Sequence, residues 1–207
     1  MTFELKFSTD DVRVLADEAA FEGHFSVRRL TVQHRLFAGG WSIPVVREVF
    51  ERGDAVGVLP YEPETDSLIL IEQFRPGALR AAGSPWMLEL IAGVVEIGES
   101  DETVAHREAA EEAACELTEL LPIASYYPSA GACSEHVRLF CGRVKTAGVG
   151  GVHGAEAEHE DILVHRIPRT EALALLAENR IPNAHTLIAL QWLQIHGDNL
   201  RQRWCAT

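Results

Sequence analysis

The chain has 207 residues, of which 47% are hydrophobic and 24% are charged, so it can bury one sizeable core and form an ordinary globular protein. Its formal net charge of −13 repels polyanions. Duplex nucleic acid and anionic membrane surfaces are therefore excluded as partners, because the sequence has no basic patch that would offset this charge. A small phosphorylated ligand fits such a chain when divalent cations locally reverse the sign of the field.

The N-terminus and the cysteines indicate the compartment. Residues 1–14 lack a basic region followed by an apolar run, and no segment approaches the roughly eighteen uninterrupted apolar residues of a membrane span. The four cysteines form no CxxC pair and do not have the spacing of a disulfide framework. We therefore expect a cytoplasmic protein with free thiols and without a zinc site.

Alternating stretches rich in β-branched residues predict the first strands. Segments 24–36 and 42–50 are separated by a glycine-containing break at 37–40, which predicts a small antiparallel sheet. From Ala55 onwards the strands are denser in apolar residues, as in a sheet that is buried on both faces. These denser strands are expected at 55–61, 68–71 and 86–91.

The second half of the chain begins with a helix. Ser100 is the expected N-cap of a helix over 101–116, with Asp101 and Glu102 near the positive end of its dipole. Residues 146–160 are glycine-rich and acidic and predict a long loop without regular structure, and loops of that length are often functional. The remaining strands are expected at about 121–128, 136–145 and 161–167, and the remaining helices at about 170–179 and 184–203.

Three carboxylates lie close together on the helix predicted at 101–116. Glu108 and Glu112 lie on one face and Glu111 at its flank, a like-charge arrangement that destabilises an isolated helix. Arg107 alone does not compensate for this repulsion. Taken by itself, the triplet fits either a solvated acidic helix face or a site for a hard cation such as Mg²⁺ or Mn²⁺.

The spacing around these carboxylates resembles the Nudix box, a signature of a loop and a helix that favours the cation site. Its pattern is Gly, five residues, Glu, seven residues, Arg-Glu, an aliphatic residue, any residue, Glu-Glu, any residue, Gly and an aliphatic residue. The charged positions and the first glycine are occupied here by Gly93, Glu99, Arg107, Glu108, Glu111 and Glu112.

Three positions depart from that pattern. Ala109 and Cys115 stand where larger aliphatic residues are usual, and Ala114 replaces the glycine that ends the motif. None of the three is an expected metal ligand. Because alanine reaches positive φ less readily than glycine, the helix is expected either to run on or to end differently at Ala114.

Segments outside the box are similar to bacterial ADP-ribose pyrophosphatases, and the similarity extends from about residue 20 to the C-terminus. These segments are 72–75, 86–93, 127–135, 158–161 and 188–193. The resemblance implies an α+β chain with the Nudix fold, an α/β/α sandwich around a mixed β-sheet. It also implies a small N-terminal antiparallel β region over 1–52, for dimerisation and substrate contact, followed by a Nudix hydrolase domain over 53–207.

The resemblance further implies a metal site that takes two or three Mg²⁺ ions, for which Mn²⁺ can substitute. The ligands would be the main-chain carbonyl of Ala92 and the carboxylates of Glu108, Glu112 and Glu160. Carboxylate and carbonyl oxygens are the ligands that such hard cations prefer.

The implied catalytic group lies partly in the acidic loop. Glu158 would be the base that deprotonates water, although spacing alone leaves the roles of Glu158 and Glu160 exchangeable. Glu111 and Arg107 complete the catalytic residues that the resemblance implies. A solvated loop without a catalytic role is the alternative for the segment that holds Glu158.

Substrate contacts are assigned by the resemblance mainly to arginines. Arg75 would grip the diphosphate, because a guanidinium fork matches phosphate oxygens and stays charged. Arg47 and Arg52 are candidates for the same anion or for the terminal ribose, and a surface ion pair is the alternative for each arginine. The remaining implied contacts are His24 at the adenine pocket, Val94 and Glu135.

The resemblance thus implies hydrolysis of ADP-ribose to AMP and ribose 5-phosphate by metal-activated water and a glutamate base. The sequence leaves open another nucleoside diphosphate sugar, such as GDP-mannose or ADP-glucose. A third interpretation is a non-catalytic nucleotide-sugar sensor, but the box glutamates are intact and no basic helix-turn-helix extension is visible. A homodimer is expected, since the N-terminal strands are too few to bury a core alone.

Overall fold

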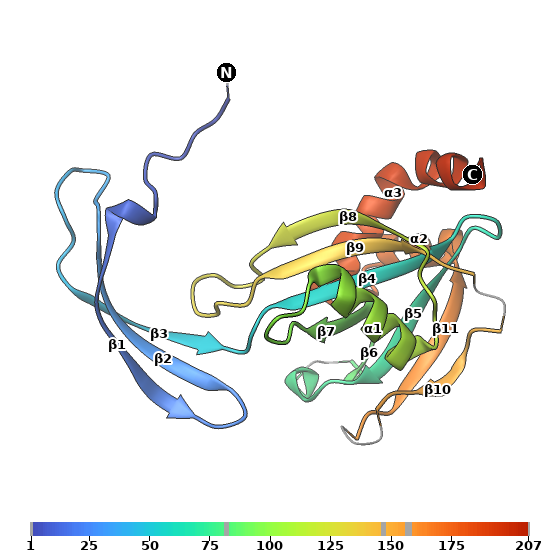
Figure 1. Ribbon diagram of the computed structural model, residues 1–207, viewed down its shortest axis with the longest axis horizontal. Helices are drawn as coiled ribbons and strands as arrows, with labels where there is room; N and C mark the ends of the chain where they lie inside the picture. Colours follow the sequence, from blue (N-terminus) through green and yellow to red (C-terminus); the bar gives the residue numbers. More distant parts are fainter. Residues whose placement is uncertain (1, 81–82, 146–147, 156–158, 207) are drawn as a thin grey trace. The chain divides into compact units, whose positions relative to one another are not determined.

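A computed structural model of the protein contains two compact units (Figure 1). The N-terminal unit is Met1–Gly53 with Tyr127–Glu135, and the larger unit is Asp54–Tyr126 with His136–Thr207. The structure describes residues 2–80, 83–145, 148–155 and 159–206. Within these ranges no helix is long and apolar enough to cross a membrane.

The N-terminal unit is a three-stranded antiparallel sheet in the order β1-β2-β3. A short helix, η1 (Thr9–Asp11), precedes the strands β1 (Val12–Glu22), β2 (Ser26–His34) and β3 (Val45–Glu51). The predicted small antiparallel sheet is confirmed, but the prediction began it at residue 24 and missed β1. All of β1 except Ala16 is exposed and its ladder is interrupted twice, so its sequence carries no regular alternation.

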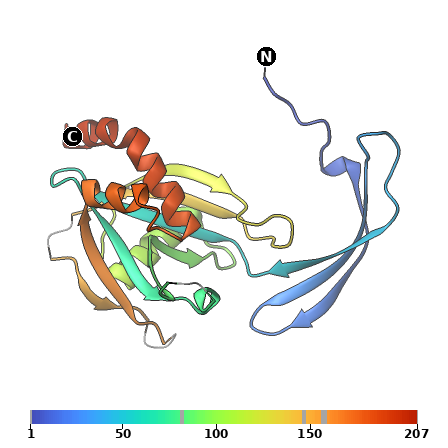
Figure 2. The same cartoon turned by 180° about the vertical axis from the view of Figure 1, so that it is seen from behind.

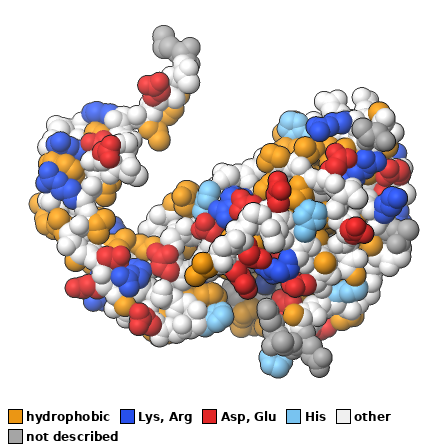
Figure 3. All heavy atoms as spheres, in the orientation of Figure 1, with side chains coloured by type: hydrophobic (Ala, Val, Ile, Leu, Met, Phe, Trp, Pro, Cys, Tyr) orange, Lys and Arg blue, Asp and Glu red, His pale blue; other side chains and the backbone are white. Residues whose placement is uncertain are grey.

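Among its described residues, this unit has no buried apolar core. No hydrophobic side chain is buried in the described part of the unit, and Figure 3 shows hydrophobic side chains at its surface on the face in view. On the strands, the exposed fraction is 62% for Val14 and Phe21 and 54% for Val46. Exposed apolar surface of this kind is typical of a region that makes a further contact.

The larger unit contains an eight-stranded mixed sheet with the main order β10-β11-β5-β4-β9-β8. β6 pairs with β5 and β7 with β4, and the β4–β9 pair is parallel while the other pairs are antiparallel. The strands are β4 (Ala55–Glu62), β5 (Ser67–Phe74), β6 (Trp86–Glu89), β7 (Ile91–Val94), β8 (Glu119–Tyr126), β9 (Val137–Arg143), β10 (Gly151–His153) and β11 (Ile162–Pro168).

Two predictions for this sheet need correction. The single strand expected at 86–91 is divided into β6 and β7, which pair with different neighbours. The expected loop at 146–160 contains the strand β10, because its backbone pairs with the free side of β11. Both differences depend on pairing with distant strands, which a local pattern does not reveal.

Helices cover both faces of the mixed sheet. α1 (Asp101–Ala113) packs on one face (Figure 1), and α2 (Arg169–Ala177) and α3 (Ala184–Cys205) pack on the other, which Figure 2 shows from behind. Alternate residues of β5 enter the two cores, so that Leu68 lies on the α3 side and Ile69 on the α1 side. The α+β class and the α/β/α sandwich around a mixed sheet are confirmed.

The ends of α1 follow from local chemistry. The Ser100 hydroxyl accepts a hydrogen bond from the Thr103 N–H at 3.2 Å, as predicted for the N-cap. At the other end Ala114 adopts a left-handed φ of 50°, and the Cys115 N–H donates to the Ala109 carbonyl at 2.9 Å. The helix therefore ends where a glycine would end it, with an alanine in a strained conformation.

Candidate active site

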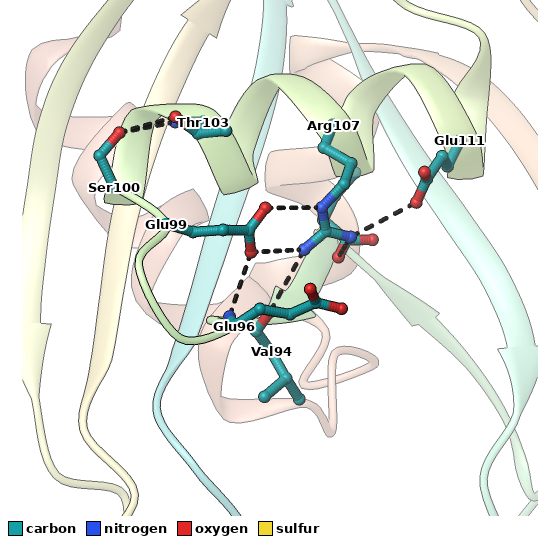
Figure 4. A network of polar contacts seen from close by, with 8 residues as sticks. Val94, Glu96, Glu99, Ser100, Thr103, Arg107 and Glu111 are labelled. Carbon is teal, nitrogen blue, oxygen red and sulfur yellow. Dashed lines mark hydrogen bonds and ion pairs between the residues drawn. The ribbon is translucent and has the colours of Figure 1, made fainter.

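Arg107 ties the loop before α1 to the helix (Figure 4). Its Nε and Nη2 donate to the two oxygens of Glu99, each at 3.1 Å, and Nη2 also donates to the Val94 carbonyl at 3.3 Å. The Glu96 N–H donates to Glu99 at 3.1 Å. The hydrogen bonds from Arg107 hold the pKa of Glu99 below its usual range. This two-pronged contact fixes the loop from Val94 to Glu99 against α1.

Glu108 lies directly against the backbone of β7. A Cβ at Gly93 would lie 1.6 Å from Glu108 Oε1, so any other residue at this position would displace the carboxylate from where it lies. Arg107 Nη1 donates to Glu108 at 2.6 Å and to Glu111 at 3.4 Å. Burial raises the pKa of Glu108, and the charge of Arg107 only partly opposes that rise. The catalytic roles predicted for Arg107 and Glu111 stay predictions.

Glu112 is more deeply buried than Glu108, with 3% of its surface exposed. Its Oε2 accepts a hydrogen bond from the Ala92 N–H at 3.2 Å, which places Ala92 and Glu112 side by side. Burial raises the pKa of Glu112 to about 8, and the charges of Glu108 and Glu160 add to the rise. The carboxylate therefore holds a proton near neutral pH unless a cation stabilises its ionised form.

Glu160 belongs to the same electrostatic environment. Its Oε2 accepts the Ala155 N–H at 3.0 Å, and its charge raises the pKa of both Glu108 and Glu112. The structure thus places the three carboxylates that the resemblance assigns to metal binding within electrostatic range of one another. Glu158, the expected base, lies outside the described residues.

The chemistry of these carboxylates fits a divalent cation. Within the described part of the chain, no three acidic, histidine or cysteine side chains are arranged as a metal cluster. One oxygen of Glu108 accepts a hydrogen bond from Arg107 instead. Their oxygen donors nevertheless suit Mg²⁺ or Mn²⁺. The raised pKa values of Glu108 and Glu112 reflect burial and repulsion from neighbouring carboxylates, which the nearby arginines do not fully offset. A bound cation would relieve both effects.

Arg75 follows strand β5 and lies within electrostatic range of Glu112. Its Nε and Nη2 both lie 2.8 Å from Glu89 Oε2. The Arg75 side chain is 43% exposed, whereas the Glu89 side chain is 4% exposed. The charge of Arg75 also opposes the rise in the pKa of Glu112. An exposed guanidinium near buried carboxylates is suited to an anionic oxygen of a ligand.

The chain matches a known protein family over most of its length. The family described as NUDIX domain matches residues 51–190, which is more than half of the chain and includes the Arg107 contacts and both buried carboxylates. The chain belongs to the Nudix family. The resemblance that rests on Gly93, Glu99 and the residues of α1 is confirmed by this match.

Known relatives of this Nudix protein cover three quarters of it or more. The ADP-ribose pyrophosphatase of Escherichia coli (strain K12) is 42% identical over 198 residues, which are 96% of this chain and 95% of the relative. The ADP-ribose pyrophosphatase of Haemophilus influenzae is 43% identical over 201 residues, 96% of this chain and 93% of the relative. The GDP-mannose pyrophosphatase of Yersinia enterocolitica is 32% identical over 159 residues, 76% of this chain and 82% of the relative.

Four of the predicted substrate contacts belong to the N-terminal unit. Arg52 Nε lies 3.3 Å from Glu135 Oε1, and Glu135 is 5% exposed. Arg47 is exposed on β3, and the His24 ring packs edge-on against Phe25 with the ring centroids 4.5 Å apart. The structure thus pairs Arg52 with Glu135, while the substrate roles of all four residues stay predictions.

The sequence did not predict the buried polar network around Glu89. Glu89 Oε1 accepts a hydrogen bond from Asn183 Nδ2 at 2.8 Å, and Asn183 is the N-cap of α3. Two signals were present in the sequence, a charged residue inside the apolar segment 86–91 and an asparagine directly before the helix predicted at 184–203. Neither signal says that the two residues meet.

Proposed function

We propose that this protein hydrolyses the pyrophosphate bond of ADP-ribose to AMP and ribose 5-phosphate. The observation that carries the proposal is the buried pair Glu108 and Glu112, whose pKa values are raised, beside the exposed guanidinium of Arg75. Such a group suits a diphosphate that is accompanied by divalent cations. ADP-ribose is favoured over GDP-mannose because the relatives named for ADP-ribose are 42% and 43% identical, against 32% for the relative named for GDP-mannose.

Mg²⁺ is the proposed cofactor, with two or three ions in the site and Mn²⁺ as a substitute. The carbonyl of Ala92 and the carboxylates of Glu108, Glu112 and Glu160 would hold them. When bound, the ions supply neutralisation of the diphosphate charge and lower the pKa of a water molecule. A nearby cation would lower the pKa of Glu112, because it stabilises the ionised carboxylate against burial and against the charge of Glu108.

The side chains of the protein bind the substrate, orient it and accept a proton. Arg75 would hold a diphosphate oxygen with the N–H groups that do not face Glu89, because the fork of a guanidinium matches phosphate oxygens. Arg107 holds the loop and Glu108 in place through its hydrogen bonds. Glu158 is the proposed proton acceptor, with Glu111 as the alternative.

The proposal also covers the substrate contacts, the two regions of the chain and the assembly. Proposed contacts to the substrate are His24, Arg47, Arg52, Val94 and Glu135. We place a dimerising N-terminal β region over 1–52 and a Nudix hydrolase domain over 53–207. A homodimer is supported by the lack of a buried hydrophobic side chain in the described part of the N-terminal unit. The cytoplasm is the proposed location.

Product identification tests the function. Purified protein with Mg²⁺ is incubated in parallel with ADP-ribose, GDP-mannose and ADP-glucose, and the phosphorylated products are separated by chromatography. The expected result is AMP and ribose 5-phosphate from ADP-ribose, with the highest kcat/KM of the three substrates and no turnover in EDTA. Preferential cleavage of GDP-mannose would replace the substrate, and binding without turnover would favour a nucleotide-sugar sensor.

A further inference from the structure

Glu89 and Asn183 have a role that the family match does not assign. We propose that they are positioning residues, which hold the Arg75 guanidinium in one orientation so that its outer edge is ready for a diphosphate. The inference rests on the proposed function in one respect, the use of Arg75 to bind a diphosphate. Neither positioning residue is expected to contact the substrate.

Glu89 holds one edge of Arg75. The Nε and Nη2 atoms of Arg75 both lie 2.8 Å from Glu89 Oε2. Glu89 is 3% exposed, whereas the Arg75 side chain is 43% exposed, so the guanidinium is anchored from the protein side and open on the other. A guanidinium has five N–H donors, and the contact with Glu89 leaves the donors of Nη1 for another partner.

The start of α3 holds the second oxygen of Glu89. Glu89 Oε1 accepts a hydrogen bond from Asn183 Nδ2 at 2.8 Å. Asn183 Oδ1 accepts the N–H and the hydroxyl of Thr186, at 3.0 and 3.1 Å. The Thr186 hydroxyl oxygen accepts the Leu90 N–H at 2.9 Å, and Thr186 is fully buried. The hydrogen bonds therefore run from Arg75 to α3 and back to the residue after Glu89.

The direction of these hydrogen bonds is fixed by the backbone. The Thr186 N–H can only donate, so the oxygen of Asn183 must face it and the amide nitrogen must face Glu89. Arg75 can also only donate. Glu89 therefore meets donors at both oxygens, as a carboxylate can. A glutamine in its place has only one acceptor oxygen, and its NH₂ group would face either Arg75 or Asn183.

Fixing Arg75 in this way favours ligand binding. A long side chain loses rotamer freedom when it binds a ligand, and an arginine that a buried partner already holds loses less of it. Loss of Glu89 or of the Asn183 donor should therefore act on the substrate through Arg75.

A double-mutant cycle tests whether Glu89 acts through Arg75. We expect Arg75→Gln to lower kcat/KM for ADP-ribose about 100-fold, and Glu89→Gln to lower it about 10-fold, mainly through KM. In the Arg75→Gln background, Glu89→Gln should cause roughly a twofold further loss or less. The matched control is Glu62→Gln, because Glu62 is also a buried glutamate, lies 3.5 Å from Arg166 and pairs with Ser67 at the opposite end of β5. Its kcat/KM should stay near the wild-type value.

Two substitutions of Asn183 separate the contact with Glu89 from the helix cap. Serine and aspartate both cap helices about as well as asparagine. Serine removes the donor to Glu89, whereas aspartate places a second carboxylate against it. We expect kcat/KM to fall about 3-fold for Asn183→Ser and about 10-fold or more for Asn183→Asp. Equal losses in the two variants would mean that Asn183 serves only as a cap.

The cycle is also measured as Kd for ADP-ribose by calorimetry in EDTA, so that it does not depend on turnover. If Glu89→Gln changes kcat/KM and Kd by the same factor in the wild-type and Arg75→Gln backgrounds, the inference is overturned. Thermal unfolding identifies any variant that does not fold, and if Glu89→Gln is one, the two Asn183 variants decide. A wild-type protein that binds ADP-ribose but does not hydrolyse it would refute the proposed function. The double-mutant cycle could then still be evaluated from the Kd values. An active wild type with an additive cycle would refute only the positioning role.

Discussion

Strands β4 and β1 show how the two units differ. All eight residues of β4 are buried, whereas all of β1 apart from Ala16 is exposed. β4 pairs with β5, β7 and β9, and helices cover both faces of its sheet. β1 lies at the edge of a sheet without a buried hydrophobic side chain among its described residues. One unit completes its own core, and the other has apolar surface left to bury.

Each unit keeps one feature that is unfavourable for its own stability. In the larger unit this feature is a buried ionisable group, because burial and the Glu108 carboxylate raise the pKa of Glu112 to about 8. A buried carboxylate of this kind is unfavourable for stability and is typical of a functional site. In the N-terminal unit the unfavourable feature is exposed apolar surface, as at Val14, which is 62% exposed. Exposed apolar surface is typical of a contact surface.

The largest effect should come from removing the charge of Glu112. Glu112→Gln keeps the size of the side chain, so kcat should fall about 10³-fold or more at saturating Mg²⁺. The Tm should not fall, because an amide replaces a buried carboxylate. Steady-state kinetics and calorimetry measure the two effects. Glu102→Gln, at an exposed position of the same helix, is the control and should keep kcat. Wild-type turnover by Glu112→Gln would remove Glu112 from the metal site.

The acidic loop should divide into two roles. Glu158→Gln should lower kcat about 10²–10³-fold and leave the Mg²⁺ dependence near wild type, because a proton acceptor acts in the chemical step. Glu160→Gln should instead raise the Mg²⁺ concentration needed for half-maximal rate. Kinetics over series of Mg²⁺ concentration and pH measure both, and higher pH should partly restore Glu158→Gln. If both variants keep normal kcat, the base lies elsewhere, with Glu111 the first candidate.

The oligomeric state tests whether the exposed apolar surface of the N-terminal unit is a contact surface. We expect a homodimer at micromolar concentration, because the N-terminal sheet exposes apolar side chains and an unpaired edge. Val14→Glu should shift the mass toward the monomer in sedimentation equilibrium. Ile195→Glu changes a side chain that is 73% exposed on α3 and should leave the mass unchanged. A wild-type monomer at this concentration would refute the dimer.

The buried carboxylate of the larger unit also predicts a pH dependence of stability without metal. The folded-state pKa of Glu112, about 8, lies above the ordinary value of 4.5. Between these values the folded protein holds the proton and the unfolded chain does not, so stability is lost as the pH rises through this window. In EDTA the Tm of the wild type should fall by roughly 5–10 °C relative to Glu112→Gln between pH 5 and 8.

Thermal unfolding of the two proteins at both pH values measures this difference. Added Mg²⁺ at pH 8 should reduce it, because a ligand that binds only the folded state stabilises that state. Parallel Tm curves for wild type and Glu112→Gln would contradict a raised pKa for Glu112. The comparison with Glu112→Gln removes the contributions of groups such as Asp54 and Asp66, whose pKa values are lowered.

Local patterns in the sequence predicted most of the larger unit. The strands from Ala55 onwards, the helix that Ser100 caps and the final helix follow from hydrophobic periodicity and capping. β1 was missed because its exposed side chains do not alternate. β10 was missed because a glycine-rich segment has low β-propensity and becomes a strand only by pairing with β11.

Long-range contacts within the site were less accessible to prediction. The box pattern includes Gly93, but only packing reveals that a Cβ there would collide with Glu108. Glu89 and Asn183 are 94 residues apart, and no local pattern joins them. The residues that meet the ligand in the proposed function were thus assigned from the box and from the resemblance of segments outside it, whereas the residues that position Arg75 required the fold.

The smallest effect concerns the end of α1, where the box glycine is replaced by Ala114. At φ 50° an alanine is less favourable than a glycine by roughly 1–2 kcal/mol, and the greater freedom of glycine in the unfolded chain offsets about half of that. Ala114→Gly should therefore raise the Tm by roughly 2–3 °C and leave kcat unchanged. Ala110→Gly, at an exposed helical position, is the matched control and should lower the Tm by a similar amount, because glycine is unfavourable inside a helix. The opposite signs separate a left-handed position from a helical one. A fall in Tm for both variants would mean that the helix runs past Ala114 in solution, which is the other outcome that the sequence allows.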